Sequence, residues 1–388
     1  MEDRQLTCID CGAPFLFTAA EQLYYAAKGY QAPRRCRACR RRRRKERKAT
    51  GIAARRQAAE DAFARRLAPY TVLPIPEIHV DAARTLYVIG NGFDLMHGVH
   101  SSYRDFSRKL GKRNTLRHAL ETYLKSDGIW ADFEESLGHL NYGLMLNSQV
   151  LDMFLDLYDA YRPNARAADF YAAVDQATRP AAEIMDILPR SFRVWVDSLV
   201  CDTDRRPLQG LIGPGRVLCF NYTEFIEELY HVPRENICYI HGCRRSEAGR
   251  PKERLVLGHL PGEEEKEWDR VRIPTPRFKD PHKRRIFQAA ADTATRNLCW
   301  YDDETTKKCE DIIRDHRAFF DGLGDVTDVV VIGHSLSRVD WEYYGQVQRS
   351  AKIRRWYFSC HDTRDLDNIE AFIAHFQIPA GCITLFRT

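Results

Sequence analysis

The stretch Thr85-Leu86-Tyr87-Val88-Ile89-Gly90-Asn91-Gly92-Phe93-Asp94 decides the fold. Its first five residues form a short apolar run, which is typical of a strand buried inside a parallel sheet. A Gly-x-Gly turn after such a strand lets the backbone approach a pyrophosphate, although Leu95 replaces the third glycine of the usual dinucleotide motif. Asp94 either binds a ribose or caps the following helix. The turn residues expected to bind a nucleotide are Gly90, Asn91 and Gly92.

Three further apolar runs end in small or polar residues of the kind that handle nucleotides. The carboxyl ends of parallel strands meet at one edge of a sheet, and ligands bind there. The sequence therefore predicts an α/β fold with a Rossmann-like parallel sheet, completed at one edge by strands near 353–358 and 383–386. The runs and the residues that follow them are 216–219 before Asn221, 237–240 before His241, and 329–332 before Gly333-His334-Ser335.

Asn221 and His241 are the candidate catalytic residues. An amide can orient a water molecule, and an imidazole can take a proton near neutral pH. Under the structural alternative, Asn221 caps a helix that starts near Thr223, and His241 completes a turn. At the last run, Gly333 and Ser335 are candidates to hold a ribose or phosphate. Two more polar residues there are His334 and Asp340. They either contact the ligand or pair with each other.

Between about residues 101 and 200 the pattern changes to that of helices. Glu134 falls on the apolar side of one segment, and a buried carboxylate needs a partner. Either it meets a ribose hydroxyl, or it makes a structural bond to a backbone group or an arginine. The apolar residues that recur there at helical spacing are Trp130, Phe133, Leu137, Leu140 and Leu144.

The net charge of +5 is concentrated in one short segment. Residues 34–48 contain eleven Lys or Arg and a single acid, Glu46, so the rest of the chain is acidic overall. Such a run can grip phosphates, with an affinity that falls as salt rises. The alternatives are a solvated helical face or a contact for acidic protein surfaces. The candidate nucleic-acid contacts are Arg40, Arg41, Arg42, Arg43, Arg44 and Lys45.

Two Cys-x-x-Cys pairs lie beside the basic run. They are Cys8 with Cys11 and Cys36 with Cys39, and this arrangement is typical of a structural zinc ion with four thiolate ligands. We expect the metal to hold the fold while the arginines contact the partner. The first 45 residues resemble a bacterial zinc-ribbon family at Cys8-Ile9-Asp10-Cys11-Gly12, Phe15 to Thr18, Glu21-Gln22, Gly29, Pro33 and Arg35-Cys36-x-x-Cys39-Arg40.

The expected organisation is a zinc ribbon over 1–45, a basic helical linker over 46–80 and an α/β domain over 81–388. No apolar stretch approaches the roughly 20 residues needed to span a membrane, and the N-terminus lacks the apolar segment of a secretion signal. We therefore expect a cytoplasmic protein without a membrane partner, whose twelve cysteines are thiols or metal ligands rather than disulfides. The oligomeric state stays open.

Seven short motifs are spread along the α/β domain. They are Val88-Ile89-Gly90-Asn91-Gly92-Phe93-Asp94-Leu95-x-x-Gly98, Tyr103-x-x-Phe106, Trp130-x-x-Phe133-Glu134, Phe220-Asn221-Tyr222-Thr223, Ile240-His241-Gly242, Leu257-Gly258-His259 and Gly333-His334-Ser335-Leu336. In these motifs the domain resembles the AbiH family, a bacterial abortive-infection family. This resemblance implies a defence against bacteriophage, set off by a trigger that the phage supplies.

The same order of landmarks is similar to the sirtuin-like fold. In that fold an asparagine and a histidine lie beside the nicotinamide ribose of NAD, which nominates Asn221 and His241 here. The resemblance implies an NAD glycohydrolase that cleaves the nicotinamide–ribose bond through an oxocarbenium-like state. The alternatives are a nucleotide-binding regulator, an effector directed at RNA or DNA without NAD hydrolysis, and a purely structural assembly module.

Overall fold

The structure is a computed structural model that divides into two compact units, Met1–Pro69 and Tyr70–Thr388. The division falls earlier than the boundary expected at residue 80. Residues 71–73 form a strand that pairs with the sheet of the second unit, so this segment belongs to the body and not to a linker. The residues that the structure describes are 2–126, 128–145, 166–245, 254–261 and 280–388.

The first unit is a β-hairpin followed by two helices. Thr18 caps the first helix through the backbone N–H of Glu21, whose carboxylate bonds back to the backbone of Thr18. The second helix begins at Arg37, earlier than the start expected for the helical linker at residue 46. Cys36 is its N-cap residue, whereas Cys39 and the candidate contacts Arg40 to Lys45 lie on the helix. The elements are β1 (Arg4–Thr7), β2 (Pro14–Phe17), α1 (Ala19–Ala27) and α2 (Arg37–Leu67).

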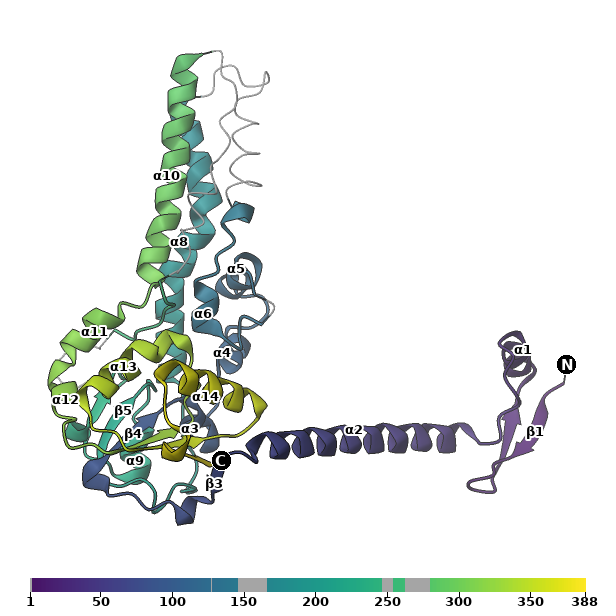
Figure 1. The fold of residues 1–388 in the computed structure, drawn as a ribbon. Coiled ribbons are helices and arrows are strands. Elements are labelled where there is room, and N and C mark those ends of the chain that lie inside the picture. The colour runs from purple at the N-terminus through teal and green to yellow at the C-terminus, as the bar shows by residue number, and fades with distance from the viewer. Residues whose placement is uncertain (1, 127, 146–165, 246–253, 262–279) are drawn as a thin grey trace. The chain divides into compact units, whose positions relative to one another are not determined.

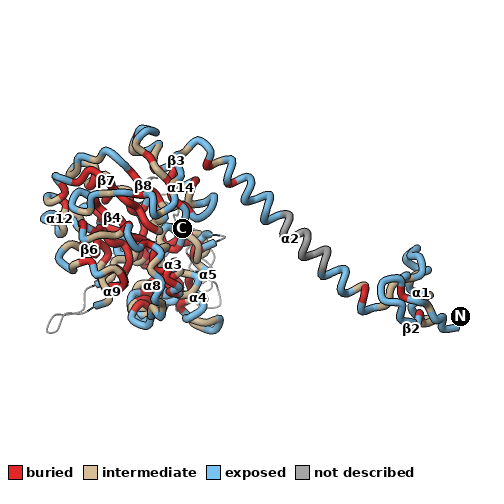
Figure 2. Tube along the Cα trace, turned by 90° about the horizontal axis from the view of Figure 1, so that it is seen from below, coloured by how far each residue is buried: buried red, intermediate tan, exposed pale blue. Residues whose placement is uncertain are grey.

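The hairpin and its neighbouring helices bury very little. Within residues 2–45 the buried side chains are those of Cys8, Phe17 and Cys39. Much of α2 is exposed along its described length (Figure 2). Two thiols and one aromatic ring are too small a core to fold a domain of this size, so another source of stability is required.

The second unit is built on a seven-stranded sheet in which every pair of neighbours is parallel. This confirms the predicted α/β class with a parallel sheet. The apolar runs fall on β4, β5, β6 and β7, and the two expected edge strands are β8 and β9. The strands are β3 (Thr71–Leu73), β4 (Thr85–Ile89), β5 (Arg216–Cys219), β6 (Ile237–Tyr239), β7 (Asp328–Ile332), β8 (Arg355–Ser359) and β9 (Ile383–Phe386).

The strand order places β4 at a branch point. The order is β3-β9-β8-β7-β4-β5-β6, so the chain runs from β4 through β5 to β6 and then returns to the other side of β4 for β7, β8 and β9. This is the order of a doubly wound sheet, extended by β3 at one edge. In such sheets the loops after the two central strands diverge to opposite faces and leave a crevice between them. Here those strands are β4 and β7.

Helices cover both faces of the sheet, because alternate residues of each buried strand point to opposite sides. Tyr87 joins the core cluster that contains Phe106 and Phe192. On the other face, Val88 lies in register beside Val331, which pairs in turn with Phe358. The Phe358 ring lies 5.8 Å from that of Phe372 in the last helix, measured between centroids.

The segment between β4 and β5 is helical, as expected over 101–200, although residues 146–165 of that range lie outside the described residues. The apolar residues that recur at helical spacing from Trp130 to Leu144 do not belong to one continuous helix. A five-residue helix ends at Leu137, and Leu140 then forms an isolated bridge with Leu124. The helices there are α3 (Asn91–Met96), α4 (Tyr103–Leu110), α5 (Thr115–Tyr123), α6 (Phe133–Leu137) and α8 (Ala167–Asp197).

Later helices return the chain to the sheet. The long α8 and α10 lie side by side (Figure 1), and the Asn297 amide of α10 donates to the Thr178 hydroxyl of α8 at 3.1 Å. None of the helices in the described ranges combines the length and apolar character of a membrane span. These later helices are α9 (Phe225–Tyr230), α10 (Pro281–Thr305), α11 (Cys309–Asp315), α12 (Arg317–Asp321), α13 (Trp341–Ser350) and α14 (Thr363–Phe376).

Three glycines lock the loops after β4 and β7 together. The Gly92 N–H donates to the Gly333 carbonyl at 2.7 Å. A Cβ atom on Gly90 would lie 2.4 Å from the Cα of His334, and one on Gly333 would lie 2.3 Å from the backbone nitrogen of Phe93. Gly333 also has φ +60°, which side chains disfavour. Close packing of backbone on backbone therefore explains these glycines without any ligand.

We predict that Gly333→Ala lowers the free energy of unfolding by about 3 kcal/mol or more, because it adds backbone strain to a contact that cannot relax. Gly324→Ala is the matched control, since a Cβ there meets open space. Urea unfolding followed by tryptophan fluorescence measures the effect on the second unit, which contains all six tryptophans. Equal stability of the two variants would contradict the proposed interlock.

Candidate functional site

A pocket of about 570 Å³ opens at the carboxyl edge of the sheet, beside the β4 and β7 loops. Its volume is within the usual range for small-molecule sites. The structure brings all of the predicted catalytic and nucleotide-binding residues of the body to its lining. Those residues are Gly90, Asn91, Gly92, Asp94, Glu134, Asn221, His241, Gly333, His334, Ser335 and Asp340.

Asp94 holds Asn221 in a fixed orientation. The Asn221 amide donates to Oδ1 of Asp94 at 2.7 Å, and the Thr223 hydroxyl donates to Oδ2 at 2.7 Å. Burial raises the pKa of Asp94 to about 7, although these two hydrogen bonds oppose the shift. Neither residue caps a helix, because α3 and α9 have Gly90 and Glu224 at their N-caps. The capping alternatives for Asp94 and Asn221 are therefore wrong.

The remaining polar atom of Asn221 is free. Its Oδ1 is buried and has no hydrogen-bond partner among the described residues. The same holds for Nε2 of His241, which lies 3.6 Å from Oδ1 of Asp340, beyond hydrogen-bond range. Oγ of Ser101, which also lines the pocket, is a third such atom. A buried polar atom without a partner is costly, so three such atoms in the wall of one pocket indicate that a polar ligand or water binds there.

His241 is held neutral. Burial lowers its pKa well below the usual range, and the nearby Lys307 ammonium lowers it further. A neutral imidazole can accept a proton or a hydrogen bond through an unprotonated ring nitrogen. Asp340 beside it favours the charged form and would stabilise an imidazolium formed after proton transfer.

Lys307 is the residue that the sequence analysis missed. Its side chain has no exposed surface, and its Nζ donates to Oε2 of Glu134 at 2.5 Å and to Oδ1 of Asp340 at 3.0 Å. Burial opposes the charged amine, but the two carboxylates outweigh it and raise the pKa of Lys307. Burial likewise opposes ionisation of Asp340, but Lys307 together with His334 and His241 outweighs it and lowers the pKa of Asp340. A lone lysine in the sequence carries no signal of this kind.

Glu134 finds the partner that a buried carboxylate requires. It pairs with Lys307 instead of the backbone group or arginine that the sequence suggested, and the Tyr103 hydroxyl donates to its Oε1 at 2.6 Å. Since Glu134 also lines the pocket, a ribose contact remains compatible with this pairing.

His334 and Asp340 lie next to each other, as one of the sequence alternatives stated. The backbone N–H of Leu336 donates to Nδ1 of His334 at 3.0 Å, so a neutral His334 carries its proton on Nε2. That nitrogen lies 3.4 Å from Oδ2 of Asp340. Asp340 is thus the common neighbour of Lys307, His241 and His334.

The Gly258-His259 motif positions Lys307. The His259 N–H donates to the Thr305 carbonyl at 2.9 Å, and the Lys307 N–H donates to the His259 carbonyl at 2.7 Å. Gly258 packs so closely that a Cβ there would lie 2.4 Å from the Thr305 oxygen. This motif therefore fixes the segment that carries the buried ammonium.

The pocket wall is acidic and aromatic. Among the residues that the structure describes, five carboxylates line it, and neither lysine nor arginine does. Phosphate groups in this pocket would depend on backbone N–H donors, whereas a cationic group would find complementary charge. Sequence reasoning did not identify the aromatic residues, which apolar spacing alone assigns to the core. They are Tyr103, Phe192, Trp195, Phe220 and Tyr222.

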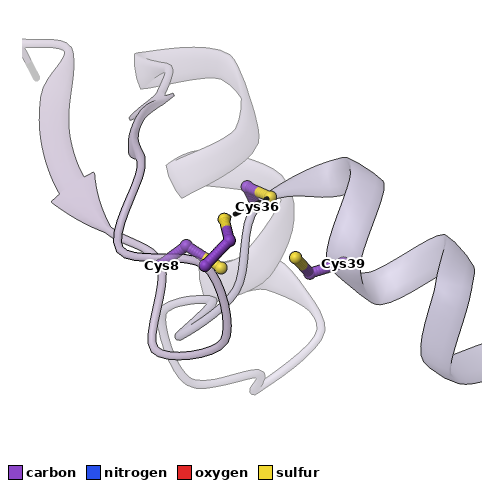
Figure 3. Close-up of side chains that lie close together, drawn as sticks. Cys8, Cys36 and Cys39 are labelled. Carbon is purple, nitrogen blue, oxygen red and sulfur yellow. Dashed lines mark hydrogen bonds between the residues drawn. The ribbon is translucent and has the colours of Figure 1, made fainter.

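The four cysteines of the first unit form a second site. Their sulfur atoms all lie within 4.8 Å of one another, and those of Cys11 and Cys36 are 3.9 Å apart. Tetrahedral zinc with Zn–S bonds of about 2.3 Å separates its sulfurs by about 3.8 Å, so the cluster fits this ion. Cys36 and Cys39 come from the start of α2, and their sulfurs face that of Cys8 (Figure 3).

The basic residues beside this cluster differ in exposure. Arg41, Arg42, Arg43, Arg44 and Lys45 are exposed, as a contact for phosphates requires. Arg40 is half-buried, and its Nη1 donates to the Tyr25 hydroxyl at 2.5 Å. It therefore also has a structural contact within the unit.

Together these features define an α/β protein with a ligand pocket at the branch point of a doubly wound sheet, joined to a small zinc-binding domain. Residues 86–360 match the family model described as Bacteriophage abortive infection AbiH. The chain therefore belongs to the AbiH family, which implies a role in anti-phage abortive infection. Residues 2–48 match a model described as a probable treble clef domain. The N-terminal zinc-binding module is therefore assigned to the treble clef class and not to the expected zinc ribbon. No curated protein and no solved structure matches the chain.

We predict that Asp94 gives the second unit a distinctive pH dependence. The folded chain keeps its proton up to about pH 7, while the unfolded chain releases it near 3.8, so this stabilisation is complete below pH 4 and is lost as the pH rises to 7. Relative to Asp94→Asn, wild-type stability should fall by up to about 4 kcal/mol between pH 4 and 8. Urea unfolding at each pH measures it, and a constant difference contradicts it.

We predict that the purified chain contains one zinc ion and that Cys36→Ser loses nearly all of it, because three thiolates cannot close the tetrahedral site. Elemental analysis after gel filtration measures the content. Cys382→Ser is the control, since this cysteine lies in the second unit. Retention of zinc by the Cys36 variant would argue against the four-cysteine site.

Proposed function

We propose that the pocket binds NAD and hydrolyses its nicotinamide–ribose bond in the host cytoplasm after a phage-derived trigger. The observation that supports this most is the pair of unpartnered buried atoms, Oδ1 of Asn221 and Nε2 of His241, in one pocket. A water or ribose hydroxyl would satisfy both atoms. A doubly wound sheet also binds nucleotides at this edge, which favours the sirtuin-like arrangement that the landmarks suggest.

The reaction assigns each residue a role. Asn221 orients a water molecule whose oxygen bonds to C1′ of the ribose as the C1′–N bond to nicotinamide breaks. The electron pair of that bond leaves with nicotinamide, and the proton of the water passes to His241 and then to solvent. Asp94 positions the amide, and Asp340 stabilises the imidazolium.

The charge of the pocket suits this reaction better than phosphoryl transfer. Positive charge lies on nicotinamide in the substrate and on the ribose in the oxocarbenium-like state. Lys307 compensates only one of the two charges of Glu134 and Asp340, and Asp362 and Asp365 also line the pocket, so the ionised side chains leave a net negative charge that stabilises the cation even with Asp94 protonated. Phosphoryl transfer instead needs cations near the developing negative charge. In the described lining, arginine and lysine side chains are lacking.

For the first unit, the function we propose is nucleic-acid binding through the exposed basic residues of α2. A helix with consecutive exposed arginines presents positive charge on several sides, and phosphates are the partner that such charge attracts without sequence preference. The treble clef would then detect nucleic acid while the pocket acts on NAD.

We predict that the wild-type chain releases nicotinamide from NAD when supplied with lysate of phage-infected cells, and that Asn221→Ala is at least about 100-fold slower. Chromatography of nicotinamide and of cellular NAD during infection measures both. Asn236→Ala is the control, because this half-buried residue precedes β6 at the amino ends of the strands and is not part of the pocket lining.

Two outcomes would contradict the hydrolase. One is an Asn221→Ala variant as active as wild type. The other is a constant NAD level in infected cells that the protein still protects, which would favour a nucleotide-binding regulator.

A further inference from the structure

Two tyrosine rings stand exposed on the first unit. Tyr24 is 58% exposed and Tyr30 is 59% exposed. Both pack against the half-buried Tyr25, with ring centroids 6.2 Å and 5.9 Å away. Phe17 supports Tyr25 from the hairpin at 5.2 Å. Exposed aromatic rings whose positions are fixed by packing can stack with other planar rings.

The same tyrosine cluster touches the basic helix. Tyr25 accepts a hydrogen bond from Arg40 at 2.5 Å, so the rings lie beside the first arginine of the run. Arg43 and Arg44 follow Arg40 by three and four residues and share its side of α2. Both are exposed. Positive charge therefore continues from the tyrosine cluster along one face of the helix.

The parts of this surface are held in place by the fold. The cysteine cluster ties the turn of the hairpin to the start of α2, and Arg35 pairs with Asp10 at 2.8 Å. The capping box at Thr18 fixes the start of α1, which carries Tyr24 and Tyr25. A surface organised before binding loses less conformational entropy when a ligand arrives.

We propose that this surface binds single-stranded nucleic acid, with Tyr24 and Tyr30 stacking on unpaired bases while Arg43 and Arg44 contact the phosphates. The inference rests on the nucleic-acid binding proposed for α2 and specifies the kind of nucleic acid as single-stranded. Bases in a duplex already stack on each other, so their faces are closed to the tyrosines. An acidic protein surface would use the arginines but would give the two rings no stacking partner.

Fluorescence anisotropy with the full-length chain tests the proposal. The probes are fluorescein-labelled oligo(U) and oligo(dT) of 20 nucleotides and a 20-base-pair DNA duplex, each at 50 and 200 mM salt. Comparing oligo(U) with oligo(dT) shows whether the surface prefers RNA or DNA, since both offer unpaired bases and phosphates. We expect the single strands to bind more tightly than the duplex and to weaken as salt rises.

The variants separate stacking from charge. Tyr24→Ala with Tyr30→Ala should lower single-strand affinity by at least about tenfold and leave duplex affinity unchanged. Replacing both tyrosines by phenylalanine should preserve binding, because stacking needs the ring and not the hydroxyl. Arg43→Ala with Arg44→Ala should weaken every probe. The control is Arg55→Ala with Arg56→Ala, which removes equal charge about 18 Å further along α2.

The outcomes distinguish the inference from the broader role. Equal binding of single strand and duplex, with no effect of the tyrosines, overturns the single-strand proposal but keeps nucleic-acid binding. Failure of all probes to bind overturns both, while the activity of the NAD pocket is judged separately by nicotinamide release. Zinc content of each variant shows that the unit remains folded.

Discussion

The buried ion pairs of Lys307 are the interaction on which the pocket depends. One ammonium compensates two carboxylates, Glu134 of α6 and Asp340 just before α13, and thereby joins segments far apart in the chain. Breaking such a group leaves uncompensated buried charge, which typically costs about 3–5 kcal/mol. Because Asp340 also neighbours His241 and His334, Lys307 governs the charge beside both imidazoles.

In the pocket wall, most polar groups are hydrogen-bonded to neighbouring residues, and a few are free to bind a ligand. Glu134, Asp94 and Asp340 are fully engaged with neighbouring side chains, and the β4 and β7 loops bond to each other through backbone groups. Among the described residues that line the pocket, three buried side-chain atoms remain without a hydrogen bond, on Asn221, His241 and Ser101. A rigid set of bonded groups that leaves a few polar atoms free for a ligand is the arrangement expected of a preorganised site.

The sequence predicted the sheet well because its central strands are buried runs with clear ends. It missed β3, since three residues of which two are exposed give no periodic signal. The helical spacing over 130–144 did not reveal where the helix ends, because apolar residues three and four apart also arise from a short helix followed by a bridge at Leu140. The residues that follow the predicted strands include most of the pocket residues that the sequence could identify. Lys307 could not be predicted, because the burial of a lysine depends on partners distant in sequence.

The pocket is assembled from segments that span almost the whole second unit, from Gly90 in the first central loop to Asp365 in α14. During synthesis these segments leave the ribosome one after another, so a nascent chain holds only a partial wall until β7, β8 and α14 have emerged. A truncated product would likewise lack part of the wall. An activity that required the complete pocket would therefore stay silent while the protein is being made.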